Sequence, residues 1–352
     1  MKAFIYSFTP TFRRLVTTLV LGAMAQATAS AQSYTITPIG RFEDNIYRVS
    51  GINNSGVIVG GRTYTLGGGS GYVAPPFRFW SGQNRMEFLP CKSSQVVGGG
   101  VNQINDNAWC AGWCNPDATS CSWDPAGALT TFGASYASGA NGLNDAATPT
   151  LVGNTYSRST GRQPAYYKNG KWVNLPTLTG KGGIAYSIDN QDHIVGVDSG
   201  SGHAVLWVPG TKGYGTPMDL TATYGGFGGT SLTKTGQVYG GSQILDLATG
   251  AVTTLTGPSG EAATITSLSN RTSSGTQRAV GYYDTGTARI PFIWDGTTVA
   301  DLATLLPLGS GWDLQQGSAP QVYINDLGWI VGMGLYTDPI QGPQNRAYLM
   351  KP

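Results

Sequence analysis

Residues 324–332, with the sequence INDLGWIVG, form one copy of a short motif that recurs along the chain. Each copy starts with Ile or Leu, passes through a turn-forming stretch and closes with Gly. The copies start at Ile52, Ile104, Leu143, Ile188, Leu232, Leu268 and Ile324. Successive starts are 52, 39, 45, 44, 36 and 56 residues apart. Self-similarity at this spacing is typical of repeat architectures such as propellers and solenoids.

Each copy predicts a hairpin, because Asn, Asp and Gly tolerate the backbone angles of tight turns. Two further strands complete the repeat. One is rich in aromatic residues, as in 77–80 (FRFW) and 204–207 (AVLW). The other alternates and ends in Leu, as in 172–175 (WVNL) and 252–255 (VTTL). Four short strands in each repeat of about 45 residues match a propeller blade.

The two ends of the repeat region complement each other. The last repeat has its hairpin and its aromatic strand at 346–350, but the chain stops before a fourth strand. Residues 34–39 (YTITPI) read as an alternating strand ahead of the first hairpin. Pairing this strand with the last blade would remove two open sheet edges. We therefore predict an all-β, seven-bladed β-propeller closed by its N-terminal strand, with an open β-solenoid as the alternative.

The N-terminus resembles a secretory signal peptide. Lys2, Arg13 and Arg14 precede an apolar stretch, and the small residues 29–31 (ASA) follow it. We expect cleavage after Ala31, with Ala27 as the second choice, which leaves residues 32–352 as one domain. The apolar stretch is shorter than the roughly 20 residues that span a bilayer, so we expect no membrane span. The predicted location is secreted, periplasmic or on the cell surface.

Charge excludes one broad class of partner. Removing residues 1–31 leaves 18 of the 21 Lys and Arg against 19 Asp and Glu, a net charge near −1. A nucleic-acid-binding surface needs a basic field that this balance does not supply. Charged residues make up only 11% of the chain, but aromatic residues make up another 11%. We therefore expect an ordered, weakly charged protein that does not bind nucleic acid, and we expect a monomer.

The repeat resembles the HAF family of bacterial extracellular repeats, which is named for a His-Ala-Phe element. The fourth copy follows the family pattern in order, with 188–196 (IDNQDHIVG), then 203–207 (HAVLW), then 218–220 (MDL). The resemblance covers the mature chain but weakens in the fifth and sixth repeats. It implies secretion and a repeat fold. It implies no reaction and no catalytic residues.

The acidic and histidine residues of the motifs favour structure over chemistry. Asp106, Asp145, Asp189 and Asp326 fall inside the predicted turns, where such side chains bond their own backbone. Calcium or catalysis is the alternative for them. The two histidines, His193 and His203, lie in one repeat without an obvious third ligand. His193 stands where other copies have Val57 or Trp329, which favours packing. We expect no metal and no cofactor.

The cysteines predict disulfides. The four cysteines all lie within one repeat, and an even number in an exported protein favours pairing. Cys114 and Cys121 flank a short predicted loop between strands, so we expect them to pair, which leaves Cys91 to pair with Cys110. A zinc site is the alternative, but the spacing lacks paired Cys-x-x-Cys units.

Connections between blades are the predicted ligand-binding region, because in propellers they gather around the central channel. Glu43 and Glu261 lie in two of them and are the candidates for a catalytic acid and base on a sugar; solvated loop charges are the alternative. The candidate ligand-binding residues in these connections are Arg41, Tyr136, Lys181, Tyr224, Trp312 and Asp313.

No catalytic motif stands out, so we predict a non-enzymatic binding or surface-interaction module. Its expected partner is an extracellular polymer, glycan or protein. A polysaccharide-active hydrolase or lyase is the first alternative, because propellers host many activities and the fold does not decide between them. A structural component of the cell envelope is the second alternative.

Overall fold

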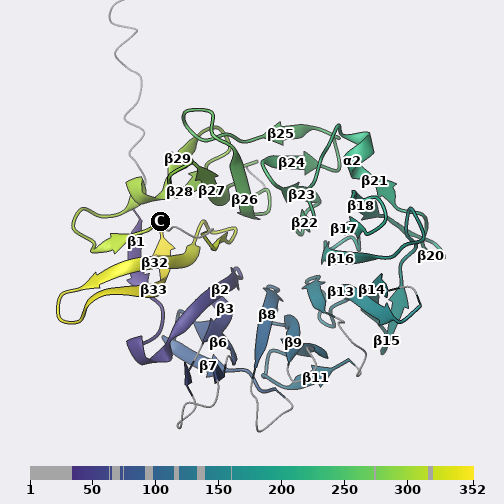
Figure 1. Ribbon diagram of the computed structural model, residues 1–352. Helices are drawn as coiled ribbons and strands as arrows, with labels where there is room; N and C mark the ends of the chain where they lie inside the picture. Colours follow the sequence, from purple (N-terminus) through teal and green to yellow (C-terminus); the bar gives the residue numbers. More distant parts are fainter. Residues whose placement is uncertain are drawn as a thin grey trace, which may run out of the picture. The chain divides into compact units, whose positions relative to one another are not determined.

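The computed structural model describes residues 34–62, 64–65, 72–73, 75–91, 98–114, 119–132, 139–159, 161–272, 275–315 and 320–352. The signal peptide predicted in residues 1–31 lies outside these ranges. Within them, the strands form seven main antiparallel sheets arranged as a ring, with one strand of each sheet innermost, toward the centre (Figure 1). We number these sheets as blades 1 to 7.

The first three blades follow one another along the chain. Blade 1 contains β2 (Ile46–Ile52), β3 (Val57–Arg62), β6 (Pro76–Trp80) and β7 (Arg85–Phe88). Blade 2 contains β8 (Gly99–Ile104), β9 (Cys110–Cys114), β10 (Thr119–Trp123) and β11 (Leu129–Thr131). Blade 3 contains β12 (Ala140–Leu143), β13 (Leu151–Ser157), β14 (Gly161–Lys168) and β15 (Lys171–Asn174).

The next three blades repeat this order. Blade 4 contains β16 (Gly183–Ile188), β17 (Ile194–Asp198), β18 (Ala204–Trp207) and β21 (Met218–Asp219). Blade 5 contains β22 (Ser231–Leu232), β23 (Gln237–Gly240), β24 (Gln243–Asp246) and β25 (Val252–Thr254). Blade 6 contains β26 (Ala263–Leu268), β27 (Ala279–Asp284), β28 (Arg289–Trp294) and β29 (Val299–Asp301).

Blade 7 joins the two ends of the chain. It contains β31 (Val322–Ile324), β32 (Ile330–Asp338), β33 (Gly342–Lys351) and β1 (Thr35–Pro38), and β30 (Trp312–Asp313) pairs with the far end of β32. Strand β1 runs antiparallel to β33, with Thr35 opposite Lys351 and Pro38 opposite Tyr348. The predicted seven-bladed propeller and its closure by the N-terminal strand are both confirmed, and the open solenoid is excluded.

The remaining elements are short. Two small hairpins pair β4 (Tyr64–Thr65) with β5 (Tyr72–Val73) and β19 (Pro209–Gly210) with β20 (Gly213–Tyr214). The helical segments are η1 (Phe42–Asp44), α2 (Leu220–Thr223) and η2 (Leu302–Leu305). None of the helices in the described ranges has the length and apolar character that crossing a bilayer requires.

Turn chemistry explains the hairpins. Asn325 Oδ1 accepts hydrogen bonds from the backbone N–H groups of Leu327 and Trp329, at 3.1 and 2.9 Å. Gly328 has φ 77°, a conformation that glycine adopts without a steric penalty. The same acceptor arrangement recurs at Asn53, which bonds Ser55 and Val57. The first polar residue of each of these motifs therefore folds its own turn.

The core lies between neighbouring blades. One apolar cluster joins Val152 of blade 3 to Ile188, Val205 and Trp207 of blade 4. Trp207 is 1% exposed and its indole N–H donates to the Pro176 carbonyl at 2.7 Å, in the connection that precedes the blade. Burial on this scale stabilises a large aromatic side chain by roughly 1.5–3 kcal/mol. Packing between sheets, together with these bonds, fixes each blade against the previous one.

The predicted cysteine pairing is wrong. Cys91 bonds Cys114, whereas Cys110 and Cys121 are free and buried. Strand register is the reason: in the β9–β10 hairpin Cys114 stands opposite Thr119, and Cys121 stands opposite Gly112. Cys91 lies beside Gly99, the residue of β8 that pairs with Cys114. Cys121 Sγ nevertheless lies 3.3 Å from Cys114 Sγ, so three sulfur atoms gather at this point.

Peptide mapping under non-reducing conditions should find one disulfide, Cys91–Cys114. Cys110 and Cys121 should resist alkylation in the folded protein, because both are buried and burial raises the pKa of the Cys110 thiol to about 12. Both should react once the protein is denatured. A Cys114–Cys121 cross-linked peptide, or a mass that requires two disulfides, would contradict the structure.

Candidate functional site

The second polar residue of each motif builds a ring around the centre of the propeller. We call these seven residues the ring positions: Asn54, Asp106, Asp145, Asn190, Lys234, Asn270 and Asp326. The backbone N–H of each one donates to an oxygen of the ring position in the next blade, at 2.7 to 3.3 Å. Six of the acceptors are side-chain oxygens. The seventh is the backbone carbonyl of Lys234, which has no side-chain acceptor.

The ring corrects the expectation for the turn carboxylates. Asp189 does bond its own turn, since its Oδ1 accepts from the backbone of Gln191 and His193, both at 2.8 Å. Asp106, Asp145 and Asp326 instead accept from the neighbouring blade. Their role is still structural, but it acts between blades rather than within a turn.

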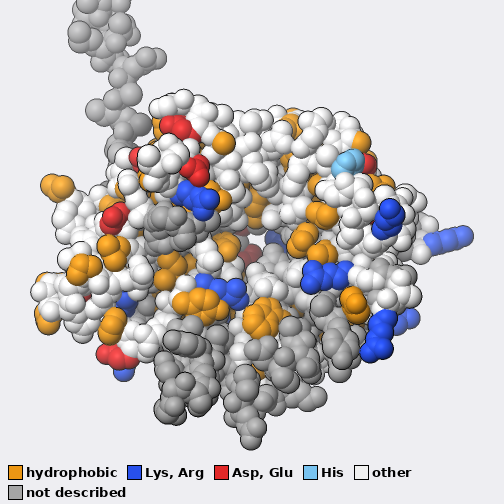
Figure 2. All heavy atoms as spheres, viewed as in Figure 1, with side chains coloured by type: hydrophobic (Ala, Val, Ile, Leu, Met, Phe, Trp, Pro, Cys, Tyr) orange, Lys and Arg blue, Asp and Glu red, His pale blue; other side chains and the backbone are white. Residues whose placement is uncertain are grey.

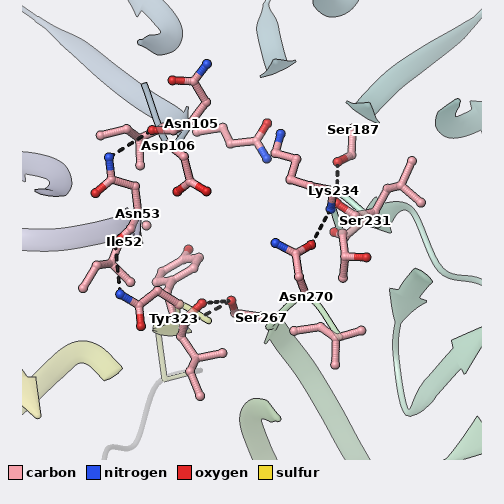
Figure 3. Close-up of a pocket in the computed structure, with 18 of the residues that line it drawn as sticks. Ile52, Asn53, Asn105, Asp106, Ser187, Ser231, Lys234, Ser267, Asn270 and Tyr323 are labelled. Carbon is pink, nitrogen blue, oxygen red and sulfur yellow. Dashed lines mark hydrogen bonds between the residues drawn. The ribbon is translucent and has the colours of Figure 1, made fainter. Parts of the chain in front are cut away.

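A central cavity of about 240 Å³ lies inside this ring (Figure 3). Residues from the innermost strands and motif turns of all seven blades line it, among them Ser50, Asn102, Tyr186, Ser231, Thr266 and Tyr323. Figure 2 shows that this face of the molecule is hollowed at its centre and that Lys and Arg side chains border the hollow.

Lining side chains cap the open edges of the innermost strands. Asn102 Nδ2 donates to the Ala140 carbonyl of the next blade at 3.0 Å, and Ser187 Oγ donates to the Leu232 carbonyl at 3.2 Å. Thr266 Oγ1 does the same with the Val322 carbonyl at 2.5 Å. The innermost strand of a blade has no further strand to pair with, so these bonds satisfy groups that would otherwise be unpaired.

Lys234 is the cation of the ring. Its ammonium group donates to the carbonyls of Leu143 and Ile188, two blades and one blade away. Burial lowers the pKa of Lys234, and the charges of Asp145, Asp106 and Asp189 offset part of that effect. In Figure 3 its side chain crosses between the turns of the ring. Lys234 therefore places a positive charge near these carboxylates without forming an ion pair with any of them, and its carbonyl bonds tie non-adjacent blades together.

Asp106 is electrostatically disfavoured in the ring. Desolvation raises the pKa of its carboxyl, and repulsion from Asp145 and Asp326 adds to the rise. Hydrogen bonds from the backbone and side chain of Asn54, at 2.9 and 2.8 Å, act in the opposite direction. The two hydrogen bonds from Asn54 stabilise the charged carboxylate of Asp106, which forms no ion pair among the described residues.

The two candidate catalytic carboxylates lie in separate connections. Glu43 is an exposed residue of η1, between blades 7 and 1. Glu261 lies between blades 5 and 6, where its Oε2 accepts from the Ser259 backbone at 2.9 Å. Neither residue lines the central cavity. Each lies in a connection, as predicted, but the two connections join different pairs of blades.

The candidate ligand-binding residues are similarly dispersed. Arg41 and Lys181 are exposed, and Asp313 bonds the backbone of Gln315 within its own loop at 2.9 Å. Tyr224 packs beside an apolar cluster of blades 4 and 5, and Trp312 lies 4.9 Å from Tyr336 between ring centroids. None of these lines the central cavity. Tyr136 lies outside the described residues.

The histidines each have their own carboxylate. His193 Nδ1 is 2.8 Å from Asp189 Oδ2, and this hydrogen bond raises the pKa of His193. His203 Nδ1 is 2.7 Å from Asp219 Oδ2. His193 is thus a partner of its own turn rather than a packing residue. Across the ranges that the structure describes, no group of three or more His, Cys, Asp or Glu residues is arranged to hold a metal ion.

Comparisons with known proteins support the fold. No family model and no curated protein matches the sequence. The chain is similar to the solved structure of YCF48 bound to D1 peptide, with TM-score 0.51, 12% identity, and coverage of 91% of this chain and 95% of that one. It is also similar to the extracellular domain of the putative hybrid two-component system BT4673 from B. thetaiotaomicron. That match has TM-score 0.51, 12% identity, and coverage of 90% of this chain and 39% of that one.

A more distant match is virginiamycin B lyase from Staphylococcus aureus, with TM-score 0.43, 8% identity, and coverage of 91% of this chain and 99% of that one. The first two matches, at 12% identity, show the propeller fold and no specific function.

Asp106→Asn should keep the ring and change its response to pH, because Asn54, Asn190 and Asn270 show that an amide can occupy a ring position. The folded-state pKa of Asp106 is raised, so the stability that this residue contributes is greatest at low pH and falls as pH rises through that pKa. The variant should therefore gain stability relative to the wild type from about pH 4 to pH 7, measured by urea unfolding.

Two variants serve as controls for Asp106→Asn. In Asp338→Asn the trend should reverse, because backbone hydrogen bonds from Gln341 and Ile340 lower the pKa of that carboxyl. Its contribution is present above the unfolded-state pKa and is lost on acidification. Asp106→Ala should lose about 1–2 kcal/mol of stability, because two hydrogen bonds disappear. Equal pH profiles for Asp106→Asn and the wild type would contradict this account of the ring.

Six four-stranded sheets and one five-stranded sheet, closed by the first strand, form the ring, and the structural matches agree with this architecture: in fold the chain is a seven-bladed β-propeller.

Proposed function

We propose that this chain is a secreted, non-enzymatic binding module. It recognises an extracellular polymer, glycan or protein at the central cavity and the surrounding connections. One observation carries the proposal: the ring carboxylates that line the cavity, Asp106, Asp145 and Asp326, are already engaged in hydrogen bonds between blades. The other lining groups include hydroxyls, amides and tyrosine rings, which suit recognition rather than proton transfer.

The scaffold supports this role. Blades joined by buried aromatic residues and a closed ring of hydrogen bonds hold a pocket in one shape, and a preformed site loses little entropy when it binds. The resemblance to HAF-type repeats supports a location outside the cytoplasm. A peptide is one candidate ligand, because YCF48, which has a similar fold, has been solved bound to D1 peptide.

A polysaccharide-active enzyme is the second candidate. This candidate needs Glu43 and Glu261 to act on one substrate. The two residues lie in different connections, and neither lines the central cavity. A structural envelope component is the third candidate, which predicts no ligand at the cavity.

The exported protein should begin at Gln32. Cleavage after Ala31 follows from the small residues at 29–31. Expression with its own N-terminus in a bacterial host, followed by Edman or mass-spectrometric sequencing of the exported fraction, measures this directly. A start at Thr28 would point to the second predicted site, after Ala27. Full-length protein retained in the cytoplasm would contradict secretion.

Exported protein incubated with a panel of extracellular polysaccharides and peptides should bind one class and leave it chemically unchanged. Binding would be measured by calorimetry, and new reducing or unsaturated ends would be measured in the same samples. Tyr186→Ala should weaken binding at least tenfold, because this partly exposed ring lines the cavity. Tyr156→Ala is the matched control, since Tyr156 is 40% exposed against 38% for Tyr186 and does not line the cavity.

If new sugar ends form with the wild type and fail to form with Glu43→Gln or Glu261→Gln, the protein is an enzyme and the proposed non-enzymatic binding role is wrong. Equal loss of affinity in the two tyrosine variants would move the binding surface away from the cavity. No ligand from either class would favour the structural role.

A further inference from the structure

Arg48 of β2 is a half-buried cation without an anion among the described residues. Its Nε and Nη2 atoms are buried and have no hydrogen-bond acceptor, and no ion pair involves Arg48 among the described residues. The Tyr47 ring lies 5.7 Å from Arg48 Cζ, measured to the ring centroid. Burying guanidinium nitrogens without acceptors is unfavourable, so this arrangement calls for a cause.

Arg78 shows how the same fold treats another buried guanidinium. Its side chain is 0% exposed, its Nη1 donates to the carbonyls of Ala108 and Asp124, and its Nη2 forms a 2.7 Å ion pair with Glu87. Arg78 and Arg48 lie in the same blade. The absence of an acceptor at Arg48 is therefore specific to its position, on the innermost strand of the blade.

Donor groups converge where Arg48 points. Its Nη2 lies directly against Gly100 of β8, in the space that a Cβ on that residue would fill, and Trp113 Nε1 lies 2.8 Å from the same point. Guanidinium and indole groups donate hydrogen bonds and accept none. Only Gly leaves room for both at position 100. Two donor-only side chains aimed at one place select for a negatively charged acceptor.

Neighbours of these donors reach the central cavity, although Arg48 and Trp113 are not themselves lining residues. Ser50, two residues after Arg48 on β2, lines the cavity, and its buried Oγ has no partner. Tyr323 of blade 7 lines the cavity too and lies close enough to feel the Arg48 charge: burial raises the pKa of its phenol and Arg48 offsets part of the rise. Strands β31 and β2 thus place two hydroxyls at one side of the hollow, and β2 and β9 place a guanidinium and an indole N–H behind them, at Gly100 of β8.

We propose that Arg48, Trp113 and Ser50 bind the carboxylate of an acidic sugar, such as a uronic acid unit of an extracellular polysaccharide. A guanidinium presents a planar fork that matches a carboxylate. The cavity of about 240 Å³ is smaller than the roughly 300–1,000 Å³ of pockets for drug-sized ligands, which favours a single sugar unit. Hydroxyls, amides and the rings of Tyr186, Tyr239 and Tyr323 can face the remainder of the sugar. This inference deepens the proposed binding function and rests on it.

Titration of the exported protein with galacturonate or glucuronate tests the site. The Trp113 indole N–H, assigned by comparison with Trp113→Phe, should shift in nitrogen–proton NMR spectra. Galactose and glucose should bind at least tenfold more weakly, because they lack the carboxylate. Arg48→Gln should lower uronate affinity at least tenfold, and Arg48→Lys should restore only part of it, because the ammonium keeps the charge and loses the fork. Arg85→Gln is the matched control, an exposed arginine on the outer strand of the same blade.

The outcomes separate this inference from the binding function. Polymer binding that depends on Tyr186 but ignores Arg48 and uronates would keep the function and overturn the acidic-sugar site. An acidic dipeptide that shifts Trp113 with equal or higher affinity would also overturn it, in favour of a peptide carboxylate. No binding by any ligand would defeat both. If Arg48→Gln fails to fold, the Trp113 response of the wild type to uronate against neutral sugar still decides.

Discussion

The hydrogen-bonded ring of seven motif turns is the constraint on which the rest of the structure depends. Each blade is a small sheet with an open inner edge, and such edges are unstable or prone to aggregate when left alone. The backbone N–H of every ring position donates a hydrogen bond to the next blade. The cycle closes where Asp326 of the last blade donates to Asn54 of the first. Because the cycle closes only when all seven turns are in place, closure by β1 and closure by the turns reinforce each other.

The fold could be predicted from the sequence because its signals are local. Turn residues such as Asn325 and Gly328 specify a hairpin by themselves, and the alternating strand at 34–39 complements the last blade. The cysteine pairing could not be predicted in the same way. It depends on which residue of β9 stands opposite Cys121, a matter of register that the spacing does not reveal.

The site was harder to predict for a related reason. Whether Asp145 bonds its own turn or the next blade depends on how blades face each other, which one repeat does not contain. Acids in the connections, such as Glu43 and Glu261, look equally suited to chemistry until their distance from the cavity is known. One signal was present: the residue after the first polar residue of each motif is Asn, Asp or Lys in all seven copies. Arg48 lies in no sequence motif, and only the structure, in which its Nε and Nη2 have no hydrogen-bond acceptor, identifies it as a candidate binding residue.

The ring positions and Arg48 play different roles around the centre of the propeller. At the ring, the carboxylates and Lys234 are engaged in hydrogen bonds between blades. Beside the innermost strand of blade 1, Arg48 remains unmatched. A protein of marginal stability retains buried guanidinium nitrogens without acceptors only where other interactions outweigh their cost. The closed ring supplies that excess, so the scaffold and the proposed binding site depend on the same interactions.

Native-state hydrogen exchange of the ring-position amides tests the central claim most directly. In a closed cycle, the backbone N–H groups of Asn54, Asp145, Lys234 and the other ring positions should exchange together, at the free energy of global unfolding. Exchange at clearly lower free energy in one or a few blades, with the others still protected, would show that the blades open independently. The ring would then not be the interaction that holds this propeller together.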